Sequence, residues 1–146
     1  MLTREQLAII ALGLAAPKKL TPVQLQKTVF LFQKAIEEGN WNKMLASKYE
    51  FVPYDYGPFC KQVYRDVSAA RVEGLADVDE SSRYVQYAAT SIGKQQAEQS
   101  LEDLPAPLAN HMRDLAKWVR QQSFSGLVGS IYRKYPEMKA NSVFRG

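Results

Sequence analysis

The side chains that could act as nucleophiles or metal ligands are few. The chain has one cysteine, Cys60, and one histidine, His111, so it cannot supply the three or four ligands of a Cys/His metal cluster. A Cys–His nucleophile pair needs an oriented base, and His111 lies beside Asn110 near a predicted helix start, at an exposed-looking position. The run Gly126–Gly129 falls inside a helical pattern and lacks the Lys-Ser/Thr end of a phosphate loop. This inventory predicts no catalytic residue, no metal, no cofactor and no enzyme activity.

A basic face on the predicted helix 58–73 points instead to a macromolecular partner. One side of this helix is apolar and is expected to pack inward: Phe59, Val63, Val67 and Ala70. Another side carries the candidate nucleic-acid contacts, at spacings of three and four: Lys61, Tyr64, Arg65, Ser68 and Arg71. Cations, a small hydroxyl and an aromatic ring are the residue types of a recognition helix. A solvated charged face is the alternative interpretation.

A second group of cations lies along the predicted helix 108–119 and just after its end. Arg113, Lys117 and Arg120 are spaced at i, i+4 and i+7, and could contact a nucleic-acid backbone or an acidic protein. A solvated face beside a helix–helix contact is again the alternative. The net charge is +4, and residues 105–146 hold seven cations against two anions. The positive charge is therefore concentrated in the C-terminal helices.

Aromatic residues gather between positions 49 and 59. We expect Phe51 and Phe59 to pack in the core. The tyrosines could stand at the rim of the core or form a surface for a protein partner, since interfaces are rich in aromatic residues. The candidate partner contacts are Tyr54, Tyr56 and Phe59.

Local signals define the elements that must position these residues. Thr3 with Gln6 predicts a first helix that Pro17 ends, and Thr21 with Pro22 and Gln24 predicts a second that Gly39 ends. An extended stretch over 49–54 and a turn over 55–58 follow. The third helix is predicted from Pro58 to about Glu73, with Gly74 as its left-handed cap.

A β-hairpin is predicted directly after this helix. Its strands are 75–78 and 83–89, joined by a polar turn. Further helices are predicted over 91–101, 108–119 and 124–135, and Phe144 is expected to dock back onto the core. The order helix, helix, helix, hairpin predicts a mainly α fold of winged helix-turn-helix type over 1–104. A helical extension over 105–146 should pack on it as a single compact unit.

Composition sets the compartment that we expect. A chain of 146 residues with 46% hydrophobic residues suits one domain with a real core. No apolar run approaches the roughly 18–20 residues that span a bilayer, so no membrane contact is predicted. A single cysteine excludes an internal disulfide framework and fits a reducing cytoplasm.

Two segments resemble a known family. The first is Leu20-Thr21-Pro22-Val23-Gln24-Leu25-Gln26-Lys27, and the second is Tyr54-Asp55-Tyr56-Gly57-Pro58-Phe59, followed by Val63-Tyr64 and Gly74-Leu75. Both are similar to the Panacea domain (SocA-like, DUF4065) and to YwgA-like bacterial and phage proteins. The similarity covers about residues 18–78. It implies an antitoxin-like protein of a toxin–antitoxin or phage-defence system, which binds a toxin or acts as an adaptor for its proteolysis. This chain differs from many members in its basic balance and its long C-terminal helices.

Two functions follow as expectations. The first is a non-enzymatic antitoxin-like or regulatory protein that binds a protein partner, possibly a toxin, through the Tyr54–Phe59 region and the C-terminal helices. The alternative is a winged-helix transcriptional regulator that binds double-stranded DNA through Lys61, Arg65 and Arg71. Such regulators usually dimerise, so a homodimer through the C-terminal helices is also expected.

Overall fold

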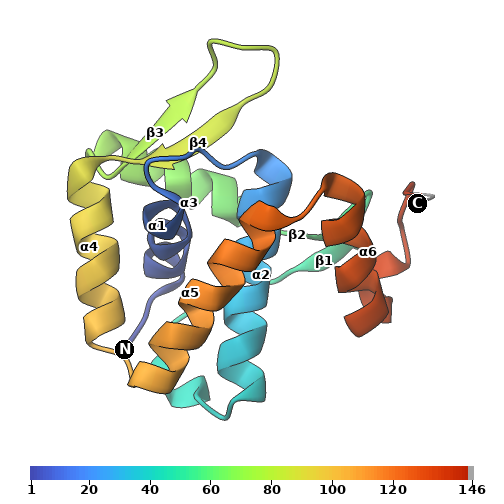
Figure 1. Ribbon diagram of the computed structural model, residues 1–146, viewed down its shortest axis with the longest axis horizontal. Coiled ribbons are helices and arrows are strands. Elements are labelled where there is room, and N and C mark those ends of the chain that lie inside the picture. The colour runs from blue at the N-terminus through green and yellow to red at the C-terminus, as the bar shows by residue number, and fades with distance from the viewer. Residues whose placement is uncertain (145–146) are drawn as a thin grey trace.

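The structure is a computed structural model that describes residues 1–144, and it is mainly helical with two short antiparallel hairpins (Figure 1). Its elements, in chain order, are α1 (Arg4–Ala15), α2 (Pro22–Glu38), the 3-10 helix η1 (Asn42–Met44), β1 (Val52–Tyr54), β2 (Gly57–Phe59), α3 (Lys61–Val72), β3 (Ala76–Asp79), β4 (Gln86–Ala89), α4 (Ser91–Glu102), α5 (Ala106–Gln121), α6 (Phe124–Lys134) and the 3-10 helix η2 (Pro136–Lys139). The predicted fold class, mainly α with a small hairpin, is confirmed.

The helix starts follow the capping signals of the sequence. Thr3 and Thr21 each accept the backbone N–H three residues on, and Gln6 and Gln24 each accept the N–H of the cap residue. These capping boxes satisfy two of the N–H groups that every helix start leaves unpaired. Ser123 caps α6 by accepting the N–H of Gly126, without the return bond of a capping box.

Helix α1 lies at the centre of the main core. Every residue from Leu7 to Gly13 is buried, because α2, α3, α4 and α5 all pack around it. The contact with α4 is close, since a side chain at Gly13 would collide with Ala97. Helix α5 crosses α2 in Figure 1 and also contacts α1, so the C-terminal helices share the core of the first hundred residues.

A second apolar cluster joins α6 and η2 to α2 and α5. Its buried members are Phe30, Leu31, Val119, Leu127, Ile131, Tyr135 and Met138. The Phe30 ring meets Tyr135 edge-on at 5.2 Å and Phe51 at 5.3 Å. The cluster therefore fixes α6 beside the β1–β2 hairpin.

The β3–β4 hairpin follows α3 as the sequence predicts, with Ala76 opposite Ala89. Leu20, between α1 and α2, pairs with Tyr87 of β4 through two backbone hydrogen bonds of 2.7 and 2.8 Å. This pairing ties the hairpin to the start of α2. Helices α2 and α3 are separated by 22 residues that include β1 and β2, so the connection is longer than the short turn of a helix-turn-helix.

The start of the third helix was wrongly predicted. Pro58 does not open it: Gly57–Phe59 form β2, paired with Val52–Tyr54, and α3 begins at Lys61. Phe59 therefore lies on a strand and only half-buried, rather than on the inward face of α3. The reason is tertiary, because side chains of α2 hold residues 58–60 in an extended conformation. The strand predicted over 83–89 is also shorter and begins at Gln86.

Two other features complete the fold. Phe144 packs against α6, with its ring 5.9 Å from Phe124 and 6.2 Å from Tyr132. Over residues 1–144, none of the helices has both the length and the apolar character needed to cross a bilayer.

Candidate functional site

The β1–β2 hairpin is fastened to α2 by two neighbouring side chains. The Gln26 side-chain amide accepts the Cys60 N–H and donates to the Cys60 carbonyl, both at 2.9 Å. The Lys27 ammonium donates to the Pro58 carbonyl at 3.1 Å. Gly57, at a φ of 101°, sits against the Lys27 stem and the Tyr132 ring. The two segments that carry the family resemblance are therefore in direct contact.

A cavity of about 210 Å³ opens between α2, the hairpin and α3. Its lining is mostly aromatic and apolar, with an amide, a cation and one carboxylate: Pro22, Val23, Gln26, Lys27, Tyr54, Asp55, Tyr56, Gly57, Phe59 and Tyr64. Lys27 is only 3% exposed, and burial lowers its pKa to about 8. Within residues 1–144, no carboxylate lies within 4 Å of its Nζ.

Two residues of the cavity lining, Tyr54 and Tyr56, belong to a larger group of exposed apolar side chains. We call Val52, Tyr54, Tyr56, Phe124 and Val143 the aromatic surface. Tyr54, Tyr56 and Phe124 are 50%, 41% and 47% exposed. The Tyr56 ring meets Phe124 edge-on at 5.1 Å, so the hairpin and α6 form one surface, and the Val143 N–H donates to the Asp55 carbonyl at 3.0 Å.

The predicted protein-partner residues thus lie together. Tyr54 stacks on Phe59 with ring centres 4.8 Å apart. Phe59 lies beneath, half-buried, and supports Tyr54 rather than facing solvent. The sequence analysis assigned no site role to Lys27 or to Phe124, because their contacts with Pro58 and Tyr56 join residues that are distant in sequence.

The predicted recognition residues of α3 divide into two groups. The exposed group contains Lys61, Arg65, Ser68 and Arg71. In the described part of the chain, none of its three cations forms an ion pair. Tyr64 is half-buried and stacks on Tyr87 at 5.6 Å, with its hydroxyl donating to the Pro22 carbonyl at 3.4 Å. Burial raises the pKa of Tyr64 to about 12. Tyr64 is therefore part of the packing.

The basic residues of α5 do not form one free stripe. Arg113 binds both carboxylate oxygens of Glu98 on α4, at 2.7 and 3.2 Å, and these hydrogen bonds lower the pKa of Glu98. Arg120 donates to the Leu14 carbonyl at 2.9 Å. Lys117 remains exposed.

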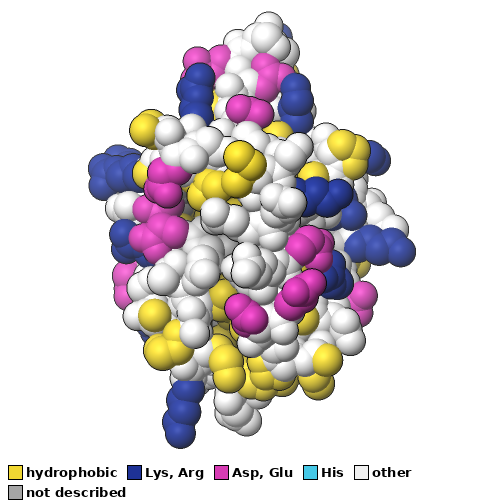
Figure 2. Space-filling model, turned by 90° about the vertical axis from the view of Figure 1, so that its left-hand side faces the viewer, with side chains coloured by type: hydrophobic (Ala, Val, Ile, Leu, Met, Phe, Trp, Pro, Cys, Tyr) yellow, Lys and Arg dark blue, Asp and Glu magenta, His cyan; other side chains and the backbone are white. Residues whose placement is uncertain are grey.

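The side of the molecule over α4 has a different character. Figure 2 shows cations and anions interspersed on this side, with hydrophobic side chains in small separate groups. In Figure 1, α4 lies on the left and the β1–β2 hairpin with α6 on the right, so the aromatic surface lies away from this side.

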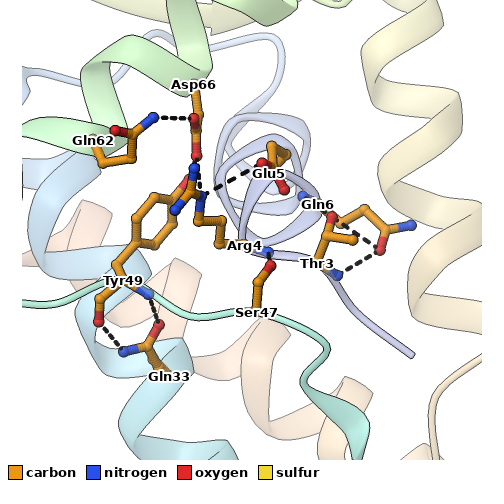
Figure 3. A network of polar contacts seen from close by, with 9 residues as sticks. All are labelled: Thr3, Arg4, Glu5, Gln6, Gln33, Ser47, Tyr49, Gln62 and Asp66. Atoms are coloured by element: carbon orange, nitrogen blue, oxygen red, sulfur yellow. Dashed lines mark hydrogen bonds and ion pairs between the residues drawn. The ribbon is translucent and has the colours of Figure 1, made fainter.

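A buried polar network stabilises the start of α1 (Figure 3). The Tyr49 hydroxyl donates to Asp66 at 2.7 Å, and Gln62 donates to the other carboxylate oxygen at 2.8 Å. The Arg4 Nε lies 3.2 Å from Asp66, and the Gln33 amide binds the Tyr49 backbone through two hydrogen bonds. Burial and Asp66 raise the pKa of Tyr49 above its ordinary value. Asp66 was not singled out in the sequence.

The remaining reactive residues stay apart. Cys60 is buried at the start of α3 and His111 is exposed on α5. Among residues 1–144 no group of three His, Cys, Asp or Glu side chains is placed to hold a metal ion.

Comparison with known proteins assigns no family. No protein-family model matches the chain, and no curated protein matches it either.

Proposed function

We propose that this chain is a non-enzymatic, antitoxin-like or regulatory protein that binds a protein partner through the aromatic surface. The observation that carries the proposal is the exposure of Tyr54, Tyr56 and Phe124: the two tyrosines line the cavity, and the Tyr56 ring contacts Phe124. Aromatic residues are enriched at protein interfaces, where they supply large contact areas. The resemblance of segments 20–27 and 54–59 to the Panacea domain supports a partner of toxin type in the cytoplasm.

The aromatic surface is held in place before any partner binds. The Gln26–Cys60 and Lys27–Pro58 hydrogen bonds anchor the hairpin from below, and the Val143 N–H binds Asp55 from the C-terminal side. Little conformational entropy is then lost on association, which favours affinity.

Affinity capture from the native host tests the proposal. Wild-type protein, a Tyr56→Ser/Phe124→Ser variant and a Lys61→Glu/Arg65→Glu variant serve as baits, with bound proteins quantified by mass spectrometry. We expect a stoichiometric protein that the aromatic variant loses by at least about tenfold, because a hot-spot residue contributes about 2 kcal/mol or more. The charge variant should retain it. A wild-type bait that recovers no stoichiometric protein contradicts the proposal.

DNA binding is the second candidate function. The free exposure of Lys61, Arg65 and Arg71 on α3, beside the β3–β4 hairpin, favours it. A mobility shift with the chain's own promoter DNA at low salt tests it, because even non-specific affinity is strong there. No shift at low salt excludes this function. Light scattering after size exclusion tests the proposed homodimer.

A further inference from the structure

The cavity beneath the aromatic surface holds a positive charge that the protein itself does not neutralise. Lys27 is 3% exposed, and its ammonium group has one hydrogen bond among residues 1–144, to the Pro58 carbonyl. An ammonium group has three donors. A buried charge is costly unless it is paired.

This charge is present under physiological conditions. A pKa of about 8 leaves Lys27 mainly protonated at pH 7. The other titratable groups of the cavity are Asp55, Tyr54, Tyr56 and Tyr64, and Tyr132 of α6 packs against Gly57 beside the Lys27 stem. Tyr64, with its pKa raised to about 12, is neutral. Asp55 is therefore the one carboxylate of the lining, and it makes no ion pair with Lys27.

The size and setting of the cavity indicate what it accepts. At about 210 Å³ it is smaller than the roughly 300–1,000 Å³ of small-molecule sites, and it opens onto apolar side chains. On η2, the exposed Lys139 lies over the Tyr132 ring, which packs against Gly57 of the cavity lining. The charge complement of this region is an acidic side chain with apolar neighbours.

We propose that the cavity receives one aspartate or glutamate side chain of the partner protein, whose carboxylate pairs with the Lys27 ammonium while neighbouring apolar residues cover the aromatic surface. This inference rests on the proposed function and assigns the chemistry of the partner's contact. The Asp55 carboxylate, which also lines the cavity, repels the partner's carboxylate and limits the affinity.

A small-molecule pair tests the cavity without the partner. The full chain is titrated with phenylacetate and with its neutral isostere phenylacetamide, while NMR follows the Lys27 side chain and the Tyr54 and Tyr56 rings. We expect phenylacetate to bind on the order of tenfold more tightly, because a hydrogen bond between two charged groups is stronger than one to a neutral amide. We also expect the Lys27 pKa to rise above 8 at saturation. Equal binding of the two compounds, no binding of phenylacetate, or an unchanged Lys27 pKa overturns the proposal.

Three variants sharpen this test. Lys27→Met removes the charge with little change in volume and should abolish the preference for phenylacetate. Lys61→Met removes an equal charge from the exposed start of α3 and should leave the preference intact. Asp55→Asn should tighten phenylacetate binding. Should Lys27→Met fail to fold, the Lys27 pKa of the wild-type protein still decides the outcome.

Partner capture distinguishes this inference from the proposed function. We expect Lys27→Met to reduce capture of the partner by at least about tenfold. Capture of the partner by Lys27→Met at the wild-type level overturns the carboxylate contact and leaves the proposed function standing. Binding of phenylacetate at Lys27 without any captured protein overturns the proposed function, and with it the assignment of the carboxylate to a protein.

Discussion

The side-chain amide of Gln26 and the backbone of Cys60 form a closed pair of hydrogen bonds, each 2.9 Å long. Gln26 lies on α2, and Cys60 joins β2 to α3. Both groups are buried, so the pair replaces the hydrogen bonds that water would make to the Cys60 backbone. This pair sets where β2 ends and α3 begins.

Replacing Gln26 with alanine should therefore destabilise the protein. The Gln26→Ala variant leaves the Cys60 N–H and carbonyl unpaired in the core, and each unsatisfied group costs about 1–3 kcal/mol. We expect a loss of about 2–4 kcal/mol in the free energy of unfolding, measured by urea denaturation. Gln95→Ala, on the exposed face of α4, should change it by less than about 0.5 kcal/mol. Similar values for the two variants would contradict the role of the pair.

The Tyr49 hydroxyl should contribute measurably to stability. Tyr49→Phe removes the hydrogen bond to the buried Asp66 carboxylate, and we expect a loss of about 1–3 kcal/mol. Tyr84→Phe, at a side chain that is 68% exposed, is the matched control and should have no effect. Thermal denaturation of both variants measures the difference. Equal melting temperatures would show that Asp66 finds compensating partners.

Stability should rise with pH above pH 8 because of Lys27. Its pKa falls from 10.5 to about 8 on folding, so the unfolded chain binds more protons between these values. The free energy of unfolding therefore increases with pH in this window, by about 2 kcal/mol between pH 8 and pH 10. Above pH 10 the raised pKa values of Tyr49 and Tyr64 act in the opposite direction. Urea denaturation across this range should show the increase in wild-type protein, and its persistence in Lys27→Met would contradict the assignment.

Two glycines should respond in opposite ways to alanine. A Cβ at Gly93, in the first turn of α4, would collide with the Leu75 carbonyl. We expect Gly93→Ala to lower the free energy of unfolding by about 1–3 kcal/mol or more, since overpacking forces the backbone to shift. A Cβ at Gly129 meets only the end of the Arg133 side chain, at 3.4 Å. Gly129→Ala should stabilise α6 by about 0.5–1 kcal/mol, and calorimetry should resolve the two signs.

Reversal of one charge on α3 separates DNA binding from a structural role. Arg65 is exposed, so Arg65→Glu should change the free energy of unfolding by about 0.5 kcal/mol or less. If α3 binds DNA, the same change abolishes the mobility shift at low salt. Arg113→Glu is the comparison, because it breaks the Glu98 contact instead and should lower stability by up to about 1 kcal/mol. A DNA shift that survives Arg65→Glu would exclude α3 as the binding element.

The sequence by itself determined the features whose causes are local. Thr3 and Thr21 marked helix starts because a cap bonds within three residues of itself. The polar turn between two apolar runs after residue 74 likewise identified the β3–β4 hairpin. These signals were enough for the mainly α fold with a hairpin after the third helix.

Only the tertiary structure decided the features that depend on residues distant in sequence. Pro58 is a good first residue of a helix, yet Gln26 and Lys27 hold residues 58–60 extended from 31 to 34 positions away. Phe59 consequently lies on a strand, and Phe124 meets Tyr56 across the hairpin and α6. Periodicity places a side chain on one face of its own helix but does not show what packs there. For that reason neither the buried Lys27 charge nor the Arg113–Glu98 contact could be predicted from the sequence alone.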